Sequence, residues 1–253
     1  MIRCFNIYYG IIIMISLVIC YGHSNNKVGS AFGNRCYQTY YDKGAANREK
    51  SGIDPNLFVP DKTVMMGTDE VKLLCGMLVI YDYNGTVLEW GSGGSTMMFS
   101  QFASTWTSIE NDKNWGKAVK DSIIKNHIKN VEIHVQPENL PWKSSVDGDG
   151  TFKQFSDYVM LPKHFENKKQ FDIIIIDGRA RVPCAIEVIK QNLLFSHGVV
   201  IIHDWNRDMY HKVLKYYTIV LEEKNERGMV VLRPKENSSH LKNSSHLRNI
   251  TRN

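Results

Sequence analysis

One segment, Val87-Leu88-Glu89-Trp90-Gly91-Ser92-Gly93-Gly94-Ser95-Thr96, predicts a strand, a glycine turn and the start of a helix. The strand ends in an acid, and Ser95 or Thr96 can cap the helix that follows. Glycines let a ligand approach the backbone closely and tolerate positive φ. Amides at the helix start can receive a carboxylate or another anion. A Gly-x-Gly pair alone fits a tight structural turn equally well, so its meaning depends on the rest of the chain.

Short apolar runs alternate with longer amphipathic stretches around this segment. This alternation predicts a doubly wound parallel sheet with helices on both faces. A helix is also expected from Thr68, with Thr68 as its N-cap and Asp69 and Glu70 complementing the positive end of its dipole. The apolar runs are Val87–Trp90, Thr107–Glu110, Val131–Val135, Phe171–Asp177 and Val199–Asp204, and helices fit at Ser95–Ala103, Lys113–Lys125 and Arg181–Leu194.

The end of the domain follows a different pattern. Tyr216–Glu222 and Met229–Arg233 are β-rich runs separated by a polar turn that contains Gly228, with no room for a helix. They predict an antiparallel hairpin. The expected fold is therefore α/β, with a Rossmann-like, doubly wound, mainly parallel seven-stranded sheet and a C-terminal antiparallel hairpin. A dinucleotide-binding domain would instead continue with another crossover helix.

A second acid strengthens the ligand-binding interpretation of the glycine turn. Glu110 ends the second run, where nucleotide-binding α/β folds place a carboxylate that accepts hydrogen bonds from ribose hydroxyls. The alternative is a surface charge at a strand end. Thr96 stands where the third glycine of a dinucleotide fingerprint would fall, which argues against NAD.

Together, Glu89-x-Gly91-x-Gly93, Glu110, the five alternating strands and the terminal hairpin resemble class I S-adenosylmethionine-dependent methyltransferases, over about residues 66–233. The resemblance implies that the glycine turn contacts the methionine part of the cofactor and that the acid after strand two holds the ribose. The cofactor-binding residues it implies are Glu89, Gly91, Ser92, Gly93, Gly94, Ser95, Glu110 and Asp177.

Two further motifs, Asp177-Gly178-Arg179 and His203-Asp204-Trp205, end adjacent predicted strands. Open α/β sheets bind ligands at that edge. Methyl transfer to oxygen needs a base near the acceptor, and a near-neutral histidine suits the task. His203 is the expected base, with Asp177 and Asp204 orienting it or contacting the substrate. The alternative makes Asp204 a helix cap and His203 a satisfied strand-end residue.

A divalent metal is left open but is not favoured. Metal-dependent O-methyltransferases of this class have acids at matching places followed by Asn, and Trp205 stands where that Asn would be. Asp177 and Asp204 could bind a cation, but the third ligand is missing. The segment from His203 to Arg207 also looks faintly like plant methyltransferases that act on glucuronoxylan in the Golgi lumen. A calcium loop at Asp147-Gly148-Asp149-Gly150 is disfavoured against a flexible turn.

The N-terminus indicates the secretory pathway. An apolar run from Ile7 to Tyr21 is shorter than a membrane span and is followed by small residues, as in a cleaved signal; an uncleaved anchor is the alternative, and only that would place the protein on a membrane. The sequons begin at Asn84, Asn237, Asn243 and Asn249. The expected organisation is a signal at 1–24, a loosely ordered lead-in at 25–65, the methyltransferase domain at 66–234 and a disordered basic tail at 235–253.

Composition and cysteines exclude little else. Hydrophobic residues make up 43% and charged residues 23%, as in an ordinary globular protein, and the net charge of +5 comes largely from the tail, so no nucleic-acid partner is expected. Cys36, Cys75 and Cys184 remain after a signal is removed; they predict no disulfide framework, although one pairing with Cys36 is open.

The expected function is O-methylation of a small molecule or saccharide. A secreted non-catalytic binding protein on this scaffold and an NAD-dependent oxidoreductase are the rivals.

Overall fold

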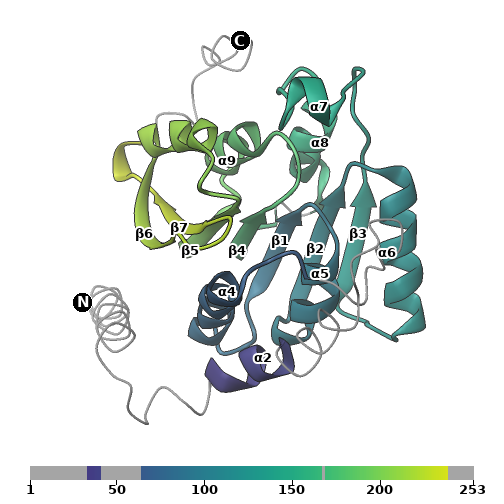
Figure 1. The fold of residues 1–253 in the computed structure, drawn as a ribbon, viewed down its shortest axis with the longest axis vertical. Coiled ribbons are helices and arrows are strands. Elements are labelled where there is room, and N and C mark those ends of the chain that lie inside the picture. The colour runs from purple at the N-terminus through teal and green to yellow at the C-terminus, as the bar shows by residue number, and fades with distance from the viewer. Residues whose placement is uncertain (1–32, 41–63, 167–168, 239–253) are drawn as a thin grey trace.

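A seven-stranded sheet in the order β3-β2-β1-β4-β5-β7-β6 organises the computed structural model, which describes residues 33–40, 64–166 and 169–238 (Figure 1). Strand β7 runs antiparallel to β5 and β6, and the other hydrogen-bonded neighbours are parallel. The predicted sheet and hairpin are therefore confirmed. The strands are β1 (Thr86–Trp90), β2 (Thr105–Glu110), β3 (Val131–Val135), β4 (Phe171–Ile176), β5 (Leu194–His203), β6 (Tyr217–Glu223) and β7 (Met229–Pro234).

Helices cover both faces of the sheet (Figure 1). The α-helices are α2 (Gly33–Tyr40), α4 (Thr68–Ile80), α5 (Gly94–Phe99), α6 (Lys113–Lys125), α7 (Ser144–Asp147), α8 (Ser156–Met160) and α9 (Arg181–Lys190). Short 3₁₀ segments are η3 (Ser100–Phe102), η4 (Leu161–His164) and η6 (Asp208–Lys215). Among the described residues, none of these helices has both the length and the apolar character needed to cross a membrane.

The isoleucine run of β4 shows why its sequence is continuously apolar. Ile174 and Ile176 are fully buried in the core that β4 shares with α8 and α9, whereas Ile173 and Ile175 are buried in the core shared with α4. Side chains alternate between faces along a strand, so a central strand covered on both sides needs apolar residues at every position. The two cores hold the strand ends, where the polar residues gather, in fixed positions.

Several boundaries differ from the sequence expectation. The N-cap of α4 is Gly67, not Thr68, and the backbone N–H of Gly67 donates to Glu70 Oε2 at 2.6 Å. Gly93 is likewise the N-cap of α5, and its N–H donates to Thr96 Oγ1 at 2.9 Å. The stretch at 95–103 divides into α5 and η3.

Part of the expected lead-in is ordered. Helix α2 lies within it, and a disulfide joins Cys36 of α2 to Cys75 of α4. The expectation of a loosely ordered lead-in is therefore wrong at 33–40. The cysteines form one disulfide bridge where no framework was expected. Cys184 is free and buried. The first tail residues are also placed, since the N–H of Lys235 donates to the carbonyl of Tyr216 at 2.9 Å. The signal segment, the rest of the lead-in and the tail from 239 lie outside the described residues.

Candidate active site

The two glycine turns at the carboxyl ends of β1 and β4 touch each other. Gly91 has a φ of 95°, and a Cβ there would lie 2.7 Å from the backbone N of Gly178. A Cβ on Gly178 would lie 2.1 Å from Tyr158 Oη. Both positions therefore need glycine, because no side chain fits between the two backbones. This contact brings the predicted cofactor turn against the predicted acceptor residues.

Glu89 lies beneath the cofactor turn with no exposed surface. Four neutral donors bind its carboxylate: the hydroxyls of Ser95 (2.6 Å), Thr96 (2.5 Å) and Ser108 (2.6 Å) and the indole N–H of Trp106 (2.8 Å). Burial raises its pKa to about 7, although the four hydrogen bonds act in the opposite direction. Glu89 and Ser95, both expected to bind cofactor, thus support the turn from below.

Glu110 joins the glycine turn directly. Its Oε2 accepts hydrogen bonds from the backbone N–H (2.9 Å) and the hydroxyl (3.0 Å) of Ser92. Its Oε1 accepts from the N–H groups of Asn111 (2.8 Å) and Asp112 (2.9 Å). Burial raises the pKa of Glu110 more than these hydrogen bonds lower it. The structure therefore brings the turn and the second acid together, as the sequence predicted.

His203 is held between two carboxylates at the end of β5. Its Nδ1 donates to Asp177 Oδ1 at 2.8 Å and its Nε2 donates to Glu70 Oε2 at 3.1 Å, while the side chain is only 2% exposed. Burial alone would lower the pKa of His203, but the two carboxylates raise it to about 10. The expected near-neutral imidazole is therefore wrong for this structure. A protonated imidazole has no lone pair with which to accept a proton.

Asp177 is the member of this trio that reaches the surface, with a side chain that is 22% exposed. Burial would raise its pKa, but the neighbouring His203 and Arg181 lower it below its ordinary value. Its Oδ1 contacts both cations, at 2.8 Å from His203 Nδ1 and 3.3 Å from Arg181 Nη2. Within the described residues, Oδ2 accepts no hydrogen bond.

Arg181 is a buried arginine that was not among the expected site residues. Its guanidinium is surrounded by acceptors: Nη2 lies 3.0 Å from Asp204 Oδ2 and donates to the carbonyl of Asp177 at 3.0 Å. Its Nη1 donates to the carbonyl of His203, and its Nε to that of Gly178 at 3.1 Å. A signal was available, because a cation in the first turn of α9 opposes the helix dipole and therefore needs an anionic partner.

Asp149 supplies one of those partners from the loop after β3. Its Oδ2 accepts the backbone N–H of Arg181 at 2.8 Å, and its Oδ1 accepts the hydroxyl of Tyr210 at 3.0 Å. The side chain is 3% exposed. The turn expected at 147–150 begins at the end of α7 and carries Asp149 as a buried acid. Glu70 was also missed as a site residue, since it was expected only to complement the dipole of α4.

Asp204 is buried and faces three arginines. Its Oδ2 lies 3.0 Å from Arg181 Nη2 and 3.2 Å from Arg207 Nη2, and its Oδ1 lies 3.9 Å from Arg227 Nη1. Asp204 itself has a φ of 57°. The sequence correctly placed Asp177, His203 and Asp204 at one sheet edge, but the structure makes Asp204 an anchor for arginines.

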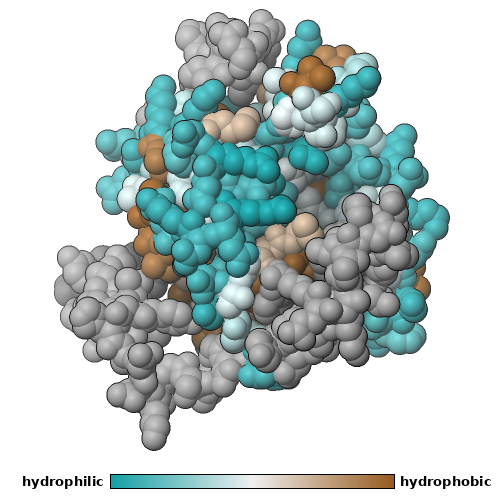
Figure 2. All heavy atoms as spheres, in the orientation of Figure 1, coloured by the Kyte–Doolittle hydropathy of each residue, from teal (hydrophilic) through white to brown (hydrophobic). Residues whose placement is uncertain are grey.

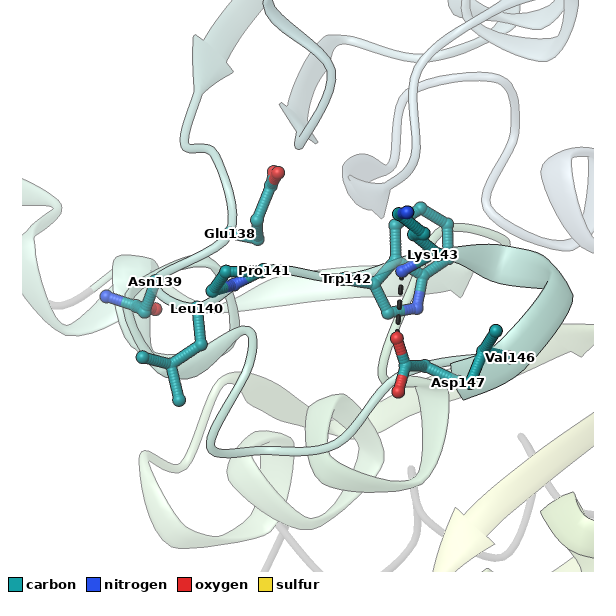
Figure 3. A pocket seen from close by; sticks show the side chains of 8 residues that line it. All are labelled: Glu138, Asn139, Leu140, Pro141, Trp142, Lys143, Val146 and Asp147. Carbon is teal, nitrogen blue, oxygen red and sulfur yellow. Dashed lines mark hydrogen bonds between the residues drawn. The ribbon is translucent and has the colours of Figure 1, made fainter.

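A pocket of about 610 Å³ opens beside this edge (Figure 3). Trp142 lies on its wall and packs edge-on against Phe155. The centre of the Trp142 ring lies 4.6 Å from the guanidinium carbon of Arg179. Phe155 and Tyr158 are fully buried in the core behind it. Hydrophobic atoms gather over α7 on this part of the surface (Figure 2), where Val146 is exposed. The pocket is lined by Glu138, Asn139, Leu140, Pro141, Trp142, Lys143, Val146 and Asp147.

Comparisons with known proteins establish the fold. No family model matches the chain, and no curated protein matches its sequence. A methyltransferase of Podospora anserina, PaMTH1, solved with S-adenosylhomocysteine, matches at a TM-score of 0.51 and 14% identity, covering 87% of this chain and 94% of its own. A Staphylococcus aureus protein provisionally assigned as a caffeoyl-CoA O-methyltransferase matches at 0.50 and 16%, covering 88% and 100%. YhhF of Escherichia coli, provisionally assigned as a methyltransferase, matches at 0.50 and 13%, covering 71% and 91%. The chain has a class I methyltransferase fold.

Proposed function

We propose that this chain is an S-adenosylmethionine-dependent methyltransferase that methylates a hydroxyl oxygen of a small molecule or a saccharide. One observation carries the proposal: Gly91, in the turn that Glu110 binds, lies against Gly178, the residue next to the partly exposed Asp177. A cofactor held by the first group would present its reactive end to the second. The fold similarity supports this assignment at the level of architecture.

The cofactor would be held by the turn from Gly91 to Gly94 and by Glu110. Ribose hydroxyls are donors of the same kind as the Ser92 groups that now bind Glu110 Oε2. The carboxylate can accept them in place of Ser92 or beside it. Glu89 fixes the turn from beneath through the Ser95 and Thr96 hydroxyls, so its contribution to cofactor affinity is indirect.

Asp177 replaces His203 as the proposed base. When bound, the cofactor supplies a methyl group whose bond to sulfur breaks as the new carbon–oxygen bond forms. Asp177 Oδ2 accepts the proton of the acceptor hydroxyl, since His203 is already protonated and its two nitrogens are engaged. His203 and Arg181 orient Asp177 through its Oδ1 and keep it ionised.

The acceptor is proposed to lie in the pocket beside Trp142. Arg179 connects the two places, because it stacks on Trp142 and is separated by one residue from Asp177 in the chain. An aromatic face flanked by polar side chains suits a saccharide or another ring-bearing acceptor.

The compartment is proposed to be the secretory lumen. Two observations support it: the Cys36–Cys75 disulfide, which an oxidising compartment favours, and the exposed positions of Asn84 and Asn237 in their sequons. Expression in secretory cells followed by glycosidase treatment tests this proposal, with the Asn84→Gln and Asn237→Gln variants assigning each glycan. Material that carries no glycan and retains residues 1–24 would contradict it.

Calorimetric titration with S-adenosylmethionine and S-adenosylhomocysteine tests the cofactor assignment. We expect binding in the micromolar range, about −8 kcal/mol. Glu110→Ala should weaken it by roughly 10- to 100-fold, as expected for lost hydrogen bonds to a carboxylate. The matched control is Glu132→Ala, an exposed acid on β3 whose loss should leave affinity unchanged.

Failure of a folded sample to bind either compound would favour the non-catalytic scaffold. Tight NADH binding without competition by either compound would favour the oxidoreductase. Once an acceptor is found by transfer of a labelled methyl group, Asp177→Asn should lower kcat by about 100-fold or more. Asp172→Asn is its control, because Asp172 lies at the opposite end of the same strand and binds Thr86.

A further inference from the structure

The two carboxylates once considered for a divalent metal already share a cation. Arg181 Nη2 lies 3.3 Å from Asp177 Oδ1 and 3.0 Å from Asp204 Oδ2. A metal bound to these two oxygens would lie about 2.0–2.6 Å from each, which is the space that the guanidinium fills. The carboxylates of Asp177 and Asp204 and the ring of His203 are close enough to form a three-ligand set, within 4.8 Å of one another. Their residue types alone would suit a metal.

We propose that Arg181 is a built-in cation that occupies this position and excludes a divalent metal from the Asp177–Asp204 pair. The residues present therefore do not fit a metal ion, and methyl transfer at this site is metal-independent. The claim about exclusion concerns this chain's own side chains and stands whether or not the proposed methyl transfer is correct.

Arg181 cannot easily move aside to admit an ion. Its side chain is 5% exposed, and three main-chain carbonyls at the ends of β4 and β5 accept its N–H groups. Its guanidinium carbon lies 5.1 Å from the centre of the Tyr210 ring, which closes another side. Asp149 completes the enclosure, with Oδ1 3.7 Å from Arg181 Nε. Displacing this guanidinium would leave several buried acceptors without donors, which is costly.

The remaining potential ligands are also committed. Both ring nitrogens of His203 face carboxylate oxygens, at 2.8 Å in Asp177 and 3.1 Å in Glu70, so neither can bind a metal without breaking one of these pairs. Arg207 and Arg227 add positive charge around Asp204. A divalent ion entering this position would be repelled by three arginines. The ligand atoms that face Arg181 or surround His203, namely Asp177 Oδ1, Asp204 Oδ2 and the two ring nitrogens, already have partners.

Titration of the purified, disulfide-intact protein with Mn²⁺, followed by the loss of the electron paramagnetic resonance signal of the free ion, tests the proposal. Site-specific binding is defined as the part that Asp204→Asn removes. We expect none in the wild type up to about 1 mM, the weak end of protein sites for divalent cations. The affinity for S-adenosylhomocysteine should be the same with Mn²⁺ and with EDTA. A stoichiometric Mn²⁺ site in the wild type that Asp204→Asn abolishes would overturn the proposal.

The Arg181→Met variant provides the converse test. Removing the guanidinium frees two carboxylates, and Mn²⁺ affinity should rise at least about tenfold over the wild type, into the sub-millimolar range. Arg179→Met is the matched control, since Arg179 lies two residues away and stacks on Trp142; its Mn²⁺ titration should match the wild type. A folded Arg181→Met protein whose Mn²⁺ affinity is no higher than that of the wild type would overturn the assignment of Arg181 as the group that excludes the metal. If that variant does not fold, the wild-type titration alone decides.

Discussion

The two halves of the candidate site stabilise buried acids in opposite ways. In the cofactor half, at the ends of β1 and β2, the donors to Glu89 and Glu110 from the described part of the chain are all hydroxyl, indole or amide groups. In the charged half, around the ends of β4 and β5, Asp177 faces the cations His203 and Arg181, and Glu70 of α4 faces His203.

The directions of the pKa shifts follow this division. Burial raises the pKa of Glu89 to about 7 and also raises that of Glu110, because neutral donors offset only part of the desolvation. Burial acts in the same direction on Asp177 and Glu70, but His203 lowers the pKa of both below its ordinary value, helped by Arg181 at Asp177 and by the N–H groups of Gly67 and Gly228 at Glu70. Asp149, whose ion pair with Arg181 spans 3.7 Å, follows the first pattern. At Glu89 and Glu110, neutral donors alone do not offset the effect of burial on the pKa, whereas at Asp177 and Glu70 a cation in direct hydrogen-bonding contact does.

The largest expected effect breaks the charged half. Arg181→Met should lower the free energy of unfolding by about 3–5 kcal/mol, because it leaves buried carboxylates without their cation. Arg207→Met removes a cation from the same Asp204, but Arg207 is half exposed, so the loss should be at most about 1 kcal/mol. Urea unfolding of both variants measures the difference. Equal losses of unfolding free energy in the two variants would show that burial does not determine how much each ion pair contributes to stability.

Removing the disulfide should loosen the charged half selectively. Cys75 lies on α4, the helix that carries Glu70 to His203. Cys36→Ser with Cys75→Ser should cost about 4 kcal/mol, from the loop of 39 residues that the bridge closes. Hydrogen exchange should then rise around α4 more than in β2. Cys184→Ser, which alters a free buried thiol, is the control for substitution at a buried cysteine. A uniform rise in exchange would contradict the selective effect.

The two halves should lose stability in different pH windows. The folded pKa of Glu89, about 7, lies above its ordinary 4.5, so the folded state binds the proton more tightly and stability falls as pH rises between these values. For His203 the same sign applies between 6.5 and about 10. Glu89→Gln should remove the first pH dependence, which is on the order of 2–3 kcal/mol in the free energy of unfolding. His203→Gln should remove the second. Thermal unfolding at a series of pH values measures both slopes. A wild type whose stability is flat from pH 5 to 9 would refute both assignments.

The smallest expected effect concerns one neutral donor. Ser108→Ala removes a hydroxyl that donates to Glu89 at 2.6 Å and should cost about 1–2 kcal/mol. The cost should be larger at pH 8 than at pH 5, because the ionised carboxylate accepts the stronger hydrogen bond. Ser104→Ala, whose hydroxyl donates to the carbonyl of Gly85 near the surface, is the control. A loss that does not change with pH would indicate that Glu89 does not titrate in this range.

The sequence predicted the cofactor half better than the charged half, for a physical reason. Glu89, the glycine turn and Glu110 are close along the chain, and local strand and turn patterns place them. The charged half is assembled from α4, the loop after β3, β4, α9 and β5, so its partners meet only through tertiary packing. Nothing in the local pattern at Glu70 or Asp149 indicated burial.

The strand and hairpin assignments succeeded because their period and apolar character are local properties. The protonation of His203 could not be predicted, since one of its partners, Glu70, is 133 residues away in the chain. The Cys36–Cys75 bridge was equally hidden, because α2 has a polar sequence and its bridge and packing on α4 join segments that are 39 residues apart. Arg181 was the exception, as its place in the first turn of a helix was a usable sign that an acid must lie nearby.

The contact between Gly91 and Gly178 constrains how such a site can evolve. Where side chains separate two loops, substitutions of different size can adjust the spacing by small steps. Here main chain meets main chain, and even one added methyl group would collide. Selection can therefore exchange the acids, hydroxyls and cations of each half, but it has no gradual route to a different separation between them. A change of acceptor would have to come from the surrounding loops, while the distance between the two turns is inherited unchanged.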